Sequence, residues 1–118
     1  MINIWTPYED GNTLGMTGTE GGVILNDEQH EAGARITLES GCLRAPFAIT
    51  TTIYNWTYHT RFFADEASAR HAYNAMQPAV VDVLALLPTE TRTGSDEIDD
   101  ATYDAITNAI ETFKANFP

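Results

Sequence analysis

The sequence predicts an α+β fold, an antiparallel meander of about five strands followed by two helices that pack on one face of the sheet as a two-layer sandwich. Two observations support this prediction. Before residue 64, short segments alternate apolar and polar residues and are joined by short turns, as in antiparallel strands. After residue 64 the apolar period changes to 3.6, as in amphipathic helices. We therefore expect a single domain, with 1–64 mostly strands and 65–118 helices.

The predicted strands are justified in chain order by their alternation and by the turns between them. A glycine-rich stretch from Pro7 to Gly22 lacks the known phosphate-binding motifs and is predicted to form turns. Within it, Thr13 to Thr17 is a candidate for a short strand. The charged segment 27–33 is predicted to be a hairpin loop. The five main strands are expected at 2–5, 23–26, 34–39, 47–54 and 56–63.

The last strand has the clearest alternation in the chain. It is expected to place Thr57, His59 and Arg61 on one face, and the apolar side chains of Tyr58 and Phe62 on the other. If the strands pair in order, the polar face also collects residues of the neighbouring strands. Those residues are Arg35, Thr37, Glu39, Thr50 and Thr52.

Capping residues predict where both helices begin. Asp65 can cap the first helix, and Ser95 the second. Pro78 lies inside the first helix and is expected to kink or restart it, because proline lacks a backbone donor and crowds the preceding turn. The predicted core combines the helix stripes with the apolar strand face: Phe47, Ile49, Ile53, Tyr58, Phe62, Met76, Val80, Leu84, Ile106, Ile110 and Phe113.

Composition restricts the classes of partner. The net charge of -11, from six basic and seventeen acidic residues, disfavours nucleic acids and anionic membranes. It is compatible with plain solubility, with an acidic surface that docks a basic protein, or with the genome composition or salty cytoplasm of the source. The single cysteine, Cys42, allows no intramolecular disulfide, and the sequence shows no signal peptide and no membrane span, so we expect a cytoplasmic protein.

Two groups of residues are candidate sites. Arg35, Glu39, His59 and Arg61 on the polar sheet face could bind an anionic ligand or exchange protons, although charged pairs are also ordinary on a solvated face. The acidic start of the last helix could dock a basic partner, although acids at a helix start are also favoured by the helix dipole. This second group comprises Asp96, Glu97, Asp99 and Asp100.

No catalytic motif and no recognisable metal-ligand set is present, so no metal and no cofactor is expected. The sequence leaves enzymatic activity undecided but favours a non-enzymatic, accessory or inhibitor-like domain that binds a basic protein. The alternative is a small-ligand-binding domain, or a minor enzyme, that uses the polar sheet face around Glu39, His59 and Arg61. A homodimer is compatible with either interpretation.

Overall fold

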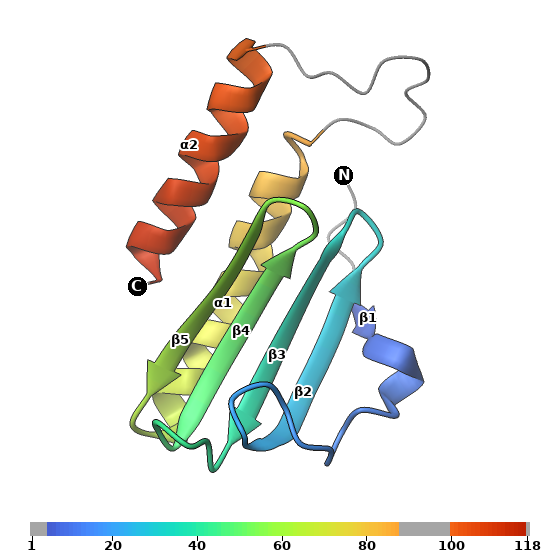
Figure 1. Cartoon of the computed structure of the whole chain (residues 1–118), viewed down its shortest axis with the longest axis vertical. Coiled ribbons are helices and arrows are strands. Elements are labelled where there is room, and N and C mark those ends of the chain that lie inside the picture. Colours follow the sequence, from blue (N-terminus) through green and yellow to red (C-terminus); the bar gives the residue numbers. More distant parts are fainter. Residues whose placement is uncertain (1–4, 88–99, 118) are drawn as a thin grey trace.

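The computed structural model describes residues 5–87 and 100–117. Five strands form one antiparallel sheet in the order β1-β2-β3-β4-β5, and two helices follow them in the chain, which confirms the predicted α+β meander. In Figure 1, α1 lies behind the sheet and α2 lies alongside α1, beyond the β5 edge. The elements are β1 (Thr6–Pro7), a short 3-10 helix η1 (Tyr8–Gly11), β2 (Val23–His30), β3 (Ala34–Ser40), β4 (Phe47–Ile53), β5 (Thr57–Phe63), α1 (Glu66–Leu84) and α2 (Asp100–Asn116).

The core lies between the sheet and α1. On β3 and β4, Leu38 lies opposite Ile49, and both side chains are fully buried on the helix side of the sheet. Met76 and Val80 of α1 pack against this layer, and α2 packs against α1. The sheet therefore has one face covered by the described α-helices, here called the helix face, and one face that neither α1 nor α2 covers, here called the open face (Figure 1).

Strand β2 is longer than the sequence pattern indicates. The predicted strand ended at Asn26, but β2 continues to His30, and the turn to β3 contains only residues 31–33. Pairing is irregular between Ile24 and Asn26, where one extra residue is accommodated as a bulge. The two acidic residues of this extension lie on opposite faces and both have polar partners, Asp27 accepting from Arg35 and Glu28 accepting from Tyr73 and Gln77. The predicted charged loop over 27–33 is therefore wrong over most of its length.

Strand β5 begins one residue later than predicted and has the opposite facing. Ile53 pairs with Thr57 and Thr51 with His59, so the odd-numbered side chains of β5 share the helix face. Tyr58 and Phe62 therefore lie on the open face, with 58% and 39% of their surface exposed, and their assignment to the core is wrong.

The other predicted core residues are buried, except Phe47, which is partly buried against the core. A predicted first strand over 2–5 falls mostly outside the described residues, and β1 at Thr6–Pro7 occupies the corresponding edge of the sheet. Thr13 to Thr17 forms no strand, only an isolated bridge from Thr17 to Val23.

Helix α1 begins as predicted. The Asp65 side chain accepts a 2.8 Å hydrogen bond from the Ser68 amide. The helix does not restart at Pro78 but continues unbroken to Leu84. Pro78 and Asn74, whose carbonyl loses its helical donor, are both exposed, so water can satisfy that carbonyl. The predicted Ser95 cap of α2 lies outside the described residues.

Candidate functional site

The open face of the sheet carries the polar side chains that the sequence pattern singled out on β3 and β4. Arg35, Thr37 and Glu39 project from β3, beside Thr50 and Thr52 of β4. The chain before β2 covers part of this face, because residues of the 8–22 segment contact the side chains of β2 and β3 there. The open face therefore divides into a covered part over β2 and β3 and a part over β5 whose aromatic side chains are exposed.

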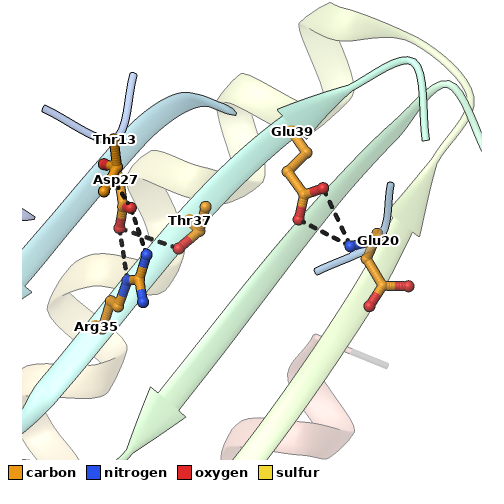
Figure 2. A network of polar contacts seen from close by, with 6 residues as sticks. All are labelled: Thr13, Glu20, Asp27, Arg35, Thr37 and Glu39. Carbon is orange, nitrogen blue, oxygen red and sulfur yellow. Dashed lines mark hydrogen bonds and ion pairs between the residues drawn. The ribbon is translucent and has the colours of Figure 1, made fainter. Parts of the chain in front are cut away.

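Asp27 of β2 is the centre of the covered part. Its carboxylate is fully buried and forms a bidentate pair with Arg35, at 2.8 Å from Nε and 2.6 Å from Nη2 (Figure 2). The hydroxyls of Thr13 and Thr37 donate to the same carboxylate at 2.8 and 3.1 Å. Four donors satisfy the buried charge, as an ionised carboxylate in a protein interior requires. This network joins the 8–22 segment to two strands.

The Arg35 guanidinium also contacts an aromatic ring. Its central carbon lies 3.7 Å from the centroid of the Tyr8 ring, a close cation–π contact. The hydrogen bonds that Arg35 donates to Asp27 raise the pKa of Arg35 above its ordinary value, against the opposing effect of burial. Arg35 therefore remains charged, and its donors to Asp27 are already used inside the protein. It is not a free anion-binding residue.

Glu39 lies farther along β3 and has a different environment. Its side chain is buried, with 1% of its surface exposed, and it accepts hydrogen bonds from the backbone amide of Glu20, as Figure 2 shows. It also accepts a hydrogen bond from the backbone amide of Gly22. These amide donors satisfy the buried oxygens of the side chain. The described part of the chain provides no cation paired with it. Glu39 therefore anchors the loop before β2 to the sheet.

Two glycines make this anchoring geometrically possible. A Cβ at Gly18 would overlap the Glu39 carboxylate, and one at Gly22 would overlap the backbone carbonyl of Ser40. Glycine permits such close approach of the backbone. The glycine-rich stretch therefore serves the packing of a loop on a sheet, in agreement with the absence of a phosphate-binding motif.

A small cavity remains between the loop and the sheet. Its volume is about 130 Å³, and it is lined by Arg35, Thr37, Glu39, Thr52 and Tyr58, among others. A water molecule occupies roughly 30 Å³ of liquid, so the cavity holds a few waters or a very small polar molecule. It is well below the range of roughly 300–1,000 Å³ that is usual for ligand pockets.

The part of the open face over β5 is different in character. Tyr58 and Phe62, with Thr60 between them, are exposed or half-buried on the face that no helix covers. We call this set the aromatic surface. Strand β5 is also an edge of the sheet, since it pairs with β4 alone among the described strands. Exposed aromatic side chains beside a strand edge are typical of contact surfaces for other molecules.

The four predicted ligand-binding residues do not form one site. Arg35 and Glu39 lie on the open face, whereas His59 and Arg61 lie on the helix face, so the predicted shared face is wrong. The His59 ring hydrogen-bonds through Nε2 with the carbonyl of Phe117 and packs edge-on against Phe113. Arg61 lies near the rings of Phe63 and Phe117.

Sequence reasoning placed Asp27 in a charged loop, with cation binding as the less favoured alternative, and so did not assign it to the open face, where it has the most polar partners. The available signal was that Asp27 and Gln29 lie two positions apart, as side chains on one strand face do, and share the open face with Ile24 once the bulge is counted. Of the predicted partner-binding acids, Asp96, Glu97 and Asp99 lie outside the described residues, and Asp100 is exposed at the start of α2.

Other chemistry is limited in the residues that the structure describes. Within 5–87 and 100–117, no group of three or more His, Cys, Asp or Glu side chains could hold a metal ion. Burial, together with the charges of Glu39 and Glu20, raises the pKa of the Cys42 thiol, which disfavours the reactive thiolate. Neither α1 nor α2, as described, has the length and apolar character needed to cross a bilayer.

Comparison with known families, with curated proteins and with solved structures gives no match to this chain.

Proposed function

We propose that this chain is a non-enzymatic protein-binding domain and that it contacts its partner through the aromatic surface of β5. The observation that carries the proposal is the exposure of Tyr58 and Phe62 on the open face, at 58% and 39%. Aromatic side chains are enriched at protein interfaces because they bury a large area at a small entropic cost. A surface with two such residues at the edge of a sheet fits a partner that packs against a strand.

The polar groups of the same face support a binding role rather than catalysis. Asp27 and Arg35 satisfy each other, and Glu39 is buried under the loop amides. A catalytic acid or base must reach a substrate with an uncommitted hydrogen-bonding position. These side chains instead hold the covering loop against β2 and β3.

The edge of β5 gives the proposed partner a second means of contact. Backbone groups on an unpaired edge can accept an extended segment by β-strand addition, while side chains on the neighbouring face supply specificity. The net charge of -11 favours a basic partner, because complementary charge accelerates encounter and suppresses association with acidic proteins.

Site-specific photo-crosslinking tests the proposal. A photoreactive phenylalanine analogue is placed at position 58, at position 62, or at position 86 as a control. Leu86 is 42% exposed, similar to Phe62, but follows α1. We expect a discrete crosslinked protein from positions 58 and 62 that is absent from position 86 and is lost at high salt. Equal crosslinking at all three positions, or none at 58 and 62, would refute the proposed surface.

The small cavity beside Glu39 supports a second candidate function, the binding of a very small polar molecule. The residues that line it include Thr37, Thr50 and Thr52, which carry hydroxyl groups, and Arg35. A ligand-observed NMR screen of small polar fragments, compared between wild type and Thr52→Val, tests it. Fragment binding that is insensitive to this substitution would exclude the cavity as the site.

A further inference from the structure

The helix face contains a second, larger hollow at one end of α1. This groove has a volume of about 500 Å³ and lies between β5, the first half of α1 and Phe117, which follows α2. Phe63, Ala72, Ala75 and Phe117 contribute apolar walls. Its volume lies in the range of roughly 300–1,000 Å³ that small-molecule sites occupy in proteins.

The charge of the groove is opposite to that of the chain as a whole. The sequence has seventeen acidic and six basic residues, yet the residues that line the groove include the cation Arg61 and no carboxylate. A cationic hollow with apolar walls selects for an anionic group attached to an apolar body, because each part then meets a complementary environment.

Arg61 is the residue that would bind the anionic group. Arg35 pairs with Asp27 and Arg70 pairs with Glu66, whereas Arg61, like the exposed Arg44 outside the groove, makes no ion pair with any described residue. Its guanidinium carbon lies 4.8 Å from the ring centroid of Phe63 and 5.9 Å from that of Phe117. Aromatic faces stabilise and orient a guanidinium while leaving its planar fork of donors for a carboxylate.

The far wall of the groove is held by a polar contact. The His59 ring hydrogen-bonds with the Phe117 carbonyl, and Phe113 packs on the same ring. This contact fixes the end of α2 against β5, so Phe117 closes one side of the groove. His59 is thus a positioning residue for the groove.

We infer that this groove is a binding site for an amphipathic carboxylate, with the carboxylate on Arg61 and the apolar body between Phe117 and the alanines of α1. The site is separate from the aromatic surface proposed for a protein partner, because Arg61 and Tyr58 point to opposite faces of the sheet. Carboxylate recognition by a guanidinium is bidentate, so the site prefers this head group to a neutral alcohol of the same length.

Titration of the full chain with octanoate, followed by amide and arginine side-chain NMR signals, tests the inference. Octan-1-ol has the same chain without the charge, and inorganic phosphate has charge without the chain. We expect saturable shifts at Arg61, Ala72, Ala75 and Phe117 with octanoate, and affinities at least about tenfold weaker for both comparison compounds. Equal affinity for octan-1-ol, equal affinity for phosphate, or no saturable binding of octanoate would overturn the inference.

Two variants localise the binding. Arg61→Gln should weaken octanoate at least about tenfold, whereas Arg70→Gln, which removes an arginine outside the groove lining, should leave it unchanged. Ala75→Phe fills the groove from an exposed helix position and should also abolish binding, without touching the charge. If Arg61→Gln is unfolded, as loss of chemical-shift dispersion in its NMR spectrum would show, the Ala75→Phe variant decides the outcome. Unchanged affinity in Ala75→Phe would place octanoate elsewhere and refute the site.

Discussion

Ile53 lies directly opposite Thr57 in the β4–β5 hairpin, and this pairing decides which side chains of β5 reach the helices. Three residues, 54–56, connect the pair, with Asn55 in the left-handed region at a φ of 73°. The Trp56 amide donates to the Ile53 carbonyl at 2.9 Å. A connection one residue shorter would reverse the facing of all of β5, because strand side chains repeat every two residues.

The conformation of Asn55 gives a first prediction. Asn55→Gly should be tolerated, whereas Asn55→Val should cost about 1–2 kcal/mol, since a branched side chain is unfavourable in the left-handed region. Urea unfolding of both variants measures this difference. Tyr54→Val is the control, because Tyr54 is exposed and is not among the residues with positive φ. Similar losses for Val at both positions would show that the turn conformation is not the cause.

The Asp27–Arg35 pair should contribute to stability, although less than a fully buried pair. The Asp27 side chain has no exposed surface, while that of Arg35 is 30% exposed. Allowing for this exposure, we expect Asp27→Asn to cost about 1–3 kcal/mol. A double-mutant cycle with Arg35→Gln measures the coupling between the two residues. Strictly additive losses would mean that the pair does not stabilise the fold.

Replacing Thr51 with valine should increase the stability of the fold. Its hydroxyl is fully buried on the helix face and has no hydrogen-bond partner among the described residues. Thr51→Val removes an unsatisfied polar group without changing the shape and should stabilise the fold by about 1 kcal/mol. Thr50→Val is the matched control, because the Thr50 hydroxyl lies 3.4 Å from that of Thr60. A lower denaturation midpoint for Thr51→Val would contradict this account.

Core and surface apolar residues should respond differently to truncation. Ile110 is 5% exposed, and Ile110→Ala should cost about 2–5 kcal/mol, as buried large-to-small changes do. Phe62→Ala should cost clearly less, because Phe62 lies on the open face at 39% exposure. Guanidinium unfolding of both variants compares them. An equal or larger loss for Phe62→Ala would show that another part of the chain covers this ring.

Asp65 gives a prediction about pH. The hydrogen bonds from the Ser68 amide and hydroxyl lower the pKa of Asp65 below its ordinary value near 3.8. A group whose pKa is lowered by folding stabilises the fold above its unfolded pKa, and that contribution is lost as the pH falls through the folded pKa. The melting temperature of wild type should therefore exceed that of Asp65→Asn at neutral pH, and the difference should shrink as the pH falls below the ordinary Asp value and through the folded pKa. A difference that is constant with pH would exclude the ionised cap.

The sequence by itself determined the order and type of the main elements. Alternation in 34–40 and 47–53 and the helical stripes of α1 and α2 are local patterns, and they predicted the meander, the Asp65 cap and most of the core. The candidate site was predictable only in part. Arg35 and Glu39 share a face because they lie four positions apart on one strand, and strand side chains repeat every two residues. This too is a local property of the sequence.

Only the tertiary structure decided which face of β5 met the helices and which polar groups were left free. Tyr58 and Phe62 are more apolar than His59 and Arg61, so local pattern favoured burying the aromatic pair, but the three-residue hairpin fixed the opposite register. The long stems and rings of Arg61 and His59 could still pack under Phe117 while their polar atoms found partners or solvent. The burial of Asp27 and Glu39 likewise depended on a loop from a distant part of the chain, and such non-local contacts leave no periodic signal in the sequence.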